Sequence, residues 1–80
     1  MSISLRWERF QGVSEIAYLG ESPIGMIGSL NADPGTWWYK VDGIDVKWVA
    51  KGFGHVKGKA SARRGVERAF AAWAERSGLL

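Results

Sequence analysis

The sequence predicts an α+β domain in which an antiparallel β-meander of three to five strands packs on one C-terminal α-helix. Short runs of alternating apolar and polar residues, separated by glycine-containing turns, extend over residues 4–51. After residue 60 the apolar spacing changes to the three- and four-residue steps of a helix. No linker, composition shift or internal repeat divides the chain, so residues 1–80 are expected to form a single domain.

The N-terminal half contains three of the predicted strands. They are expected at about residues 4–10, 14–19 and 23–30. Gly25 and Gly28 in the third run indicate a weakened strand or the close approach of other atoms. The strongest turn signal follows at residues 31–35, because Pro34 presets one central φ and Gly35 accepts a positive one.

A β-hairpin is predicted next, between strands at about residues 36–41 and 44–51. Asp42-Gly43 favours a type I′ turn, which is the usual two-residue hairpin loop. The resulting register pairs Val41 with Ile44, Tyr39 with Val46, and Trp37 with Trp48. These large apolar side chains are therefore expected on one buried face of the sheet.

Trp38 points to the opposite face of this predicted hairpin, opposite Lys47 and beside Lys40. Two interpretations of Trp38 stay open. Its side chain packs beneath the N-terminal strands as part of the core, or it is an exposed aromatic that contacts a partner. Tryptophan is enriched among the residues that dominate protein interfaces, so the second interpretation makes Trp38, Lys40 and Lys47 candidate partner-binding residues.

The C-terminal part predicts a loop at residues 52–59, which are rich in glycine and lysine, and a helix over about 60–77. Ser61 is the expected N-cap residue, and Gly78 is expected to end the helix at the C′ position. One apolar stripe follows the helix and is expected to face the sheet: Ala62, Val66, Ala69, Phe70 and Trp73.

The composition restricts the ways in which the domain is stabilised. Chains below about 80 residues seldom gain more than about 3–5 kcal/mol from one core, and many add disulfides, metals or a partner subunit. This chain has no Cys and a single His, which excludes a disulfide and argues against a zinc site. We expect no metal and no cofactor, with stability from five Trp and other aromatics and a homodimer as an option.

Groups suited to catalysis are scarce, so the sequence predicts a protein that is not an enzyme. A Ser22, His55 and Asp45 set can be written down, but no local motif supports it. The carboxylates Glu8, Glu15 and Glu21 are expected to point outward from alternating strands. No catalytic residue is therefore assigned.

Basic residues gather before and within the predicted helix. The formal net charge is +3, and six of the eleven Lys and Arg residues lie between Lys51 and Arg68. Arg63 and Arg64 oppose the helix macrodipole in the first turns. Two interpretations stay open. A phosphate or acidic surface docks on Lys57, Lys59, Arg63 and Arg64, or these residues form a solvated face that Glu67 partly balances.

The segment that contains these cations resembles the end of double-stranded-RNA-binding domains. The likeness rests on Gly52, Phe53, Gly54, Lys57, Lys59, Ala60, Ala62 and Ala69. It covers about a quarter of the chain and implies that Lys57 and Lys59 grip phosphates. The chain departs from that family because its first 20 residues read as strands rather than a helix, and Gly58 separates the two lysines.

The whole chain is similar to small phage and prophage accessory proteins, many of which are anti-CRISPR proteins, because it is a short, cysteine-free, Trp-rich meander with one helix. That resemblance implies an inhibitor that binds a CRISPR effector and keeps target DNA out, and it carries no individual residue. A basic nucleic-acid-binding module is the alternative. The sequence has no apolar run near the roughly twenty residues of a membrane span and no charged-then-apolar N-terminus typical of a signal peptide. We therefore expect no membrane association and a cytoplasmic location, in the host cell if the protein is phage-encoded.

Overall fold

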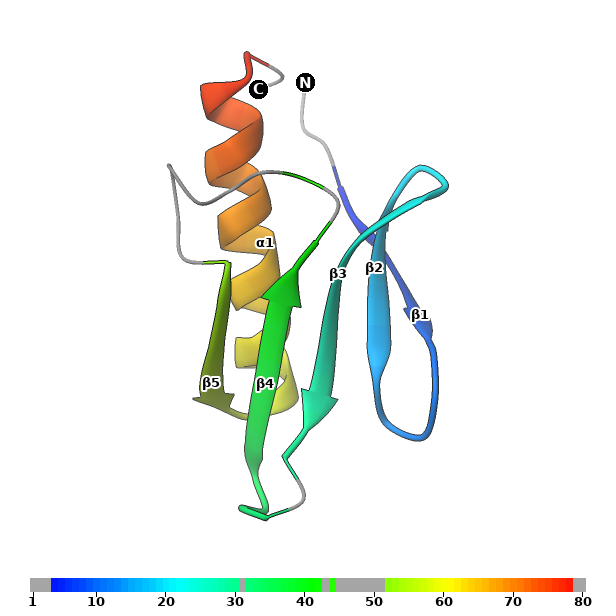
Figure 1. Cartoon of the computed structure of the whole chain (residues 1–80), viewed down its shortest axis with the longest axis vertical. Coiled ribbons are helices and arrows are strands. Elements are labelled where there is room, and N and C mark those ends of the chain that lie inside the picture. The colour runs from blue at the N-terminus through cyan, green and yellow to red at the C-terminus, as the bar shows by residue number, and fades with distance from the viewer. Residues whose placement is uncertain (1–3, 31, 43, 45–51, 79–80) are drawn as a thin grey trace.

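The computed structural model describes residues 4–30, 32–42, 44 and 52–78 of the chain (Figure 1). Its elements are β1 (Arg6–Arg9), β2 (Glu15–Leu19), β3 (Ser22–Ser29), β4 (Thr36–Val41), β5 (Phe53–Lys57) and α1 (Lys59–Arg76). The strands form one five-stranded antiparallel sheet in the order β1-β2-β3-β4-β5, and α1 covers one of its faces (Figure 1). The predicted α+β meander with a C-terminal helix is thus confirmed.

The predicted hairpin between residues 36–41 and 44–51 is wrong, because β4 pairs with β5 on one side and with β3 on the other. Tyr39 lies opposite Gly54, and Trp37 lies opposite Val56. Residues 52–59, expected as a loop, therefore contain the fifth strand and the start of the helix. The predicted strand from residue 45 to residue 51, with Lys47 in it, lies outside the described residues, and Ile44 is in a bend.

Glycine explains why β5 occupies this place. A Cβ atom at Gly54 would lie 2.9 Å from Cε2 of Tyr39, and one at Gly65 of α1 would lie 2.7 Å from the same ring. Tyr39 therefore fits between β5 and α1 only because both neighbours lack a side chain. The glycine that obscured the strand pattern in the sequence is required by the packing of that strand.

The core lies between α1 and the sheet. On the helix it consists of Ala62, Val66, Ala69, Phe70 and Ala74, and on the sheet of Ala17, Ile24, Ile27 and Tyr39. A Cβ atom at Gly25 would lie 2.8 Å from Cγ1 of Val66, so this glycine lets the helix approach β3 closely. Trp37 and Val41 pack against the core as expected, and Trp73 is half-buried beside Phe70, with ring centroids 6.1 Å apart.

The sequence predicted the C-terminal end of α1 correctly but not its N-terminal end. The helix begins at Lys59 after Gly58, whose φ is 87°, so the expected N-cap role of Ser61 is wrong. Ser61 instead accepts a hydrogen bond from Nη2 of Arg64 through its Oγ, at 2.8 Å. Gly78 follows the helix with a φ of 78° and donates its N–H to the carbonyl oxygen of Glu75, which confirms the C′ glycine.

Candidate functional site

The sheet face that points away from α1 is called the open face here. Gly25 and Tyr39 face the helix, and because side chains alternate along a strand, their neighbours point the other way. No described helix or strand covers this face (Figure 1). Its side chains, placed by strand register, belong to Arg6, Glu8, Ile16, Tyr18, Met26, Trp38, Lys40, Phe53, His55 and Lys57.

Trp38 lies at the centre of the open face. Gly28 is its cross-strand neighbour on β3, and a Cβ atom at Gly28 would lie 2.3 Å from Cζ2 of the indole. The indole therefore rests directly over the backbone of Gly28, in space that any other residue would fill. The side chain is half-buried and lies outside the helix-side core. The structure thus places Trp38 against β3 on the open face and not among the residues of the helix-side core.

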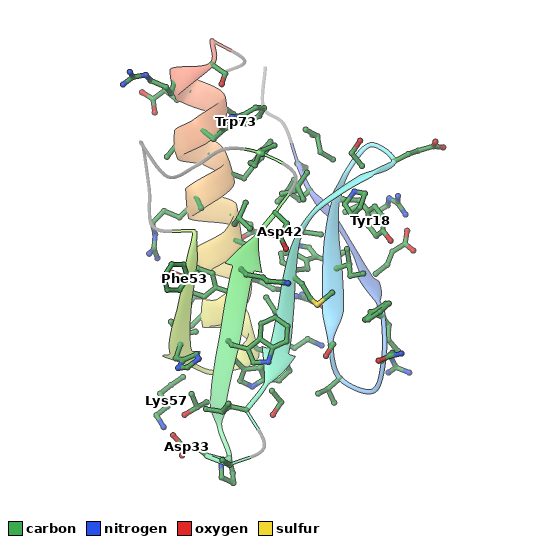
Figure 2. All side chains as sticks on the ribbon, viewed as in Figure 1. Tyr18, Asp33, Asp42, Phe53, Lys57 and Trp73 are labelled. Atoms are coloured by element: carbon green, nitrogen blue, oxygen red, sulfur yellow. The ribbon has the colours of Figure 1, made fainter. Side chains whose placement is uncertain are left out.

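An apolar band surrounds this indole. Met26 lies opposite Ile16 on β2, so the two side chains adjoin on the same face. Phe53 lies on β5 opposite Lys40 and is 66% exposed. Figure 2 shows Tyr18 on β2 and Phe53 on β5, toward opposite edges of the sheet and at the two ends of the band. Lys40 lies between Met26 and Phe53 in the register, so the apolar side chains of β3 and β5 are connected through Trp38, which is a diagonal neighbour of both.

The charged side chains bordering the band pair with carboxylates of the same chain. Arg6 pairs with Glu8, Lys40 with Asp42 at 3.3 Å, and Lys57 with Asp33 at 3.5 Å. Figure 2 shows Lys57 and Asp33 near one another at the end of β5. Among the described residues of this border, three cations thus pair with three carboxylates, so that their charges balance.

Further contacts hold two of these cations in place. The Arg6 guanidinium lies 4.8 Å from the centre of the Tyr18 ring and donates a hydrogen bond to the Gly20 carbonyl oxygen at 3.0 Å. Lys57 donates a hydrogen bond to Oγ1 of Thr36 at 2.8 Å. Thr36 in turn donates to Asp33, and this hydrogen bond, followed by the charge of Lys57, lowers the pKa of Asp33. Arg6 and Lys57 therefore each have several contacts within the chain.

The predicted basic cluster is divided between three places. Lys59 and Arg63 both bind Glu15 of β2, with 2.7 Å from Lys59 Nζ to Oε2 and 2.9 Å from Arg63 Nε to Oε1. Lys57 belongs to the border of the open face, and Arg64 bonds Ser61. Of the four cations of the phosphate interpretation, the structure brings Lys59 and Arg63 together at Glu15, whereas Lys57 and Arg64 have other partners.

Glu15 is the residue that the sequence analysis placed wrongly. It is only 9% exposed and faces α1, opposite Ile27, instead of pointing into solvent. Burial raises the pKa of Glu15, but the hydrogen bonds and charges of Lys59 and Arg63 outweigh that effect and hold the pKa below its ordinary value. The Arg63 guanidinium also lies 5.5 Å from the centre of the Trp7 ring. We call Glu15, Lys59 and Arg63 the Glu15 cluster.

The described residues contain no group of three or more His, Asp or Glu side chains arranged to hold a metal ion. Nor does this part of the chain contain a helix long and apolar enough to cross a membrane. Comparison with protein-family models, curated proteins and solved structures finds no match for this chain. Its function is therefore argued from its own residues.

Proposed function

We propose that this chain is a non-enzymatic protein-binding module that docks a partner protein on the open face, with the Trp38 indole as the central contact. The observation that carries the proposal is the position of this indole, which rests over Gly28 within an apolar band. Interfaces between proteins concentrate aromatic and apolar side chains at the centre and place polar groups at the rim. A large aromatic held in one place also loses little conformational freedom on binding.

The balance of charge favours a protein over a nucleic acid as the partner. Nucleic-acid interfaces need a surplus of cations facing the phosphates. On the open face each of Arg6, Lys40 and Lys57 already has a carboxylate partner. Lys59 and Arg63 are engaged by Glu15 on the other side of the sheet. A neutral, aromatic surface suits a folded protein whose own contact patch is apolar.

The resemblance to anti-CRISPR proteins gives this proposal a specific form. In that form the partner is a subunit of a CRISPR effector complex in the host cytoplasm. Docking of the open face would occupy part of the effector surface and prevent target DNA from binding. One experiment tests both: whether the open face captures a protein tests the general proposal, and the identity of that protein tests the specific form.

That experiment is capture of partners from host lysate, with and without nuclease, by wild-type protein and three variants. Trp38→Ala removes the indole, and Gly28→Ala adds a methyl group in the space that the indole occupies. Glu75→Ala is the matched control, because Glu75 is exposed on α1, on the far side of the sheet. Circular dichroism verifies that each variant is folded.

We expect wild type and Glu75→Ala to retain the same proteins after nuclease treatment, and Trp38→Ala and Gly28→Ala to lose them. With the purified partner, Trp38→Ala should weaken binding by about 2 kcal/mol, or about 30-fold in Kd. CRISPR effector subunits among the retained proteins would support the inhibitor form, and other proteins would reject it. Full retention by folded Trp38→Ala would refute docking on the open face.

Nuclease-sensitive retention is the result that favours the nucleic-acid alternative. In that case an Arg64→Glu variant should lose binding while Trp38→Ala keeps it. Arg64 is the suitable probe because it is exposed and makes its side-chain hydrogen bond to Ser61, outside the Glu15 cluster. Reversing the charge of both Arg63 and Arg64 would be a poorer test, because Arg63 binds the buried Glu15 and its reversal would also disturb the fold.

A further inference from the structure

The outer edge of β5 presents backbone groups that β4 does not use. Val41 donates its N–H to the Gly52 carbonyl oxygen at 2.7 Å, and Gly58 donates to that of Gly35 at 3.0 Å. In an antiparallel ladder, alternate residues direct both backbone groups to the same neighbour. Counting from these two bonds, Gly54 and Val56 face β4, whereas His55 and Lys57 direct their N–H and C=O groups outward.

Among the described strands, none pairs with the outer edge of β5. Proteins blunt edge strands with proline, bulges or charged side chains. β5 contains no proline, and its register with β4 is continuous from Phe53 to Lys57. Its one charged side chain, Lys57, is held by Thr36 and Asp33 of the same chain. β1, at the opposite edge, has three charged residues in four positions.

We propose that two copies of this chain form a dimer by antiparallel pairing of their β5 strands, which joins the two sheets into one. A register centred on Val56 places His55 of each copy opposite Lys57 of the other. The outward groups of these residues then form about four backbone hydrogen bonds between the copies. The two Val56 side chains meet on the helix side of the junction, with Cα atoms about 4.5 Å apart, as in other non-hydrogen-bonded pairs.

The position of α1 fits such a dimer. The helix packs on β4 and β5 as well as on β3, so it lies near the β5 edge (Figure 1). In the joined sheet the order is β4-β5-β5-β4, and the two helices lie on the same face of that sheet. Burial at the strand pair would add to a small core, in which the largest fully buried side chains are Ile24, Ile27 and Val66.

Sedimentation velocity of the full chain from about 1 µM to about 1 mM tests this proposal. We expect twice the chain mass of 8.8 kDa at the upper concentrations. His55→Pro removes an N–H that points outward and that β4 does not use, so the domain should fold as a monomer, with the dimer Kd raised at least about tenfold. His55→Thr keeps the N–H group and should still dimerise. A monomeric wild type throughout this range would overturn the proposal.

A second measurement avoids the risk that proline disturbs the fold. The chain has no Cys, so Val56→Cys introduces a single thiol on the proposed axis. Mild oxidation should convert this variant to a covalent dimer, and the exposed-helix control Glu75→Cys should cross-link far more slowly. Equal rates for the two would overturn the β5 pairing. Neither result tests whether the open face captures a partner protein through Trp38. The dimer proposal can therefore be refuted without refuting the proposed function, and the reverse also holds.

Discussion

Among the charged residues that the structure describes, Glu15 is the one that is buried, and two cations contact it. Its carboxylate is nearly buried on β2 and is bound by two cations from the first turns of α1. A buried charge is tolerated when it is paired and hydrogen-bonded, and removal of one partner leaves it uncompensated. The Glu15 cluster therefore joins the N-terminal half of the sheet to a helix that otherwise packs on β3, β4 and β5.

Reversing the charge of two adjacent arginines should have very different effects. Arg63→Glu would place a second carboxylate beside Glu15, and we expect it to lower the free energy of unfolding by about 2–3 kcal/mol, because the pair is only partly exposed. Arg64→Glu changes an exposed residue and should cost below about 0.5 kcal/mol. Urea denaturation followed by circular dichroism measures both, and equal losses would contradict this role of Glu15.

The same carboxylate should make stability depend on pH. The pKa of Glu15 is lower in the folded protein than its ordinary value of 4.5, so the unfolded chain binds more protons in acid. Its contribution is therefore complete above about pH 4.5 and is lost as the pH falls through the folded pKa. Asp33 acts in the same direction. Urea midpoints between neutral and acidic pH should fall less steeply in Glu15→Gln than in wild type; parallel curves would be inconsistent with this assignment.

Gly28→Ala tests, in the absence of any partner, whether the Trp38 indole packs against Gly28. The added methyl group would overlap Trp38, so we expect the indole to rotate away at a cost of about 1 kcal/mol, with the helix-side core unchanged. In ¹H–¹⁵N spectra the Trp38 indole resonance should shift, and the backbone resonances of α1 should stay in place. An unmoved Trp38 resonance would mean that the indole does not rest on Gly28.

At the scale of elements, the first four strands and the helix could be predicted from periodicity. The helix was expected at 60–77 and spans Lys59–Arg76, and Gly78 ends it as expected. The partner of β4 could not be predicted, because Asp42-Gly43 is a strong local hairpin signal and the glycines within and on both sides of β5 mask its alternation. What decides the pairing is the space that Gly54 and Gly65 leave for Tyr39, a tertiary effect.

The candidate site was predicted only in part. Trp38 and Lys40 belong to the open face, and so does Lys57. Ile16 and Tyr18 also lie there, which leaves Glu15, with the opposite parity in β2, facing the helix. Strand parity carries this information, but the sequence does not show which face of β2 the helix covers. For that reason the pairing of Lys59 and Arg63 with Glu15 could not be predicted.

The packing of α1 predicts unequal effects of its two aromatics. Phe70 is 3% exposed within the core, so Phe70→Ala should lower the free energy of unfolding by about 3–5 kcal/mol, which approaches the whole stability of a domain this small. Trp73 is half-buried beside it, and Trp73→Ala should cost less. Thermal unfolding compares the two, and a more stable Phe70→Ala would contradict the described core.

For the whole molecule, the arrangement of layers separates the core from the proposed binding face. The helix-side face holds the core and the Glu15 cluster, and the open face holds Trp38, the apolar band and a border of paired charges. Substitutions on the open face should therefore affect binding more than folding. The β5 edge lies between these faces and is the surface proposed to pair with a second copy.

The central claim is that a protein partner docks on the open face, and NMR mapping with the captured partner tests it most directly. We predict that resonances of the Trp38 indole and the Met26 methyl group shift or broaden on addition of partner. The methyl resonances of Ala60 and Ala71, exposed on α1, should stay unchanged. Perturbation of these helix resonances, with Trp38 and Met26 unaffected, would place the interface on the other side of the molecule and contradict the account.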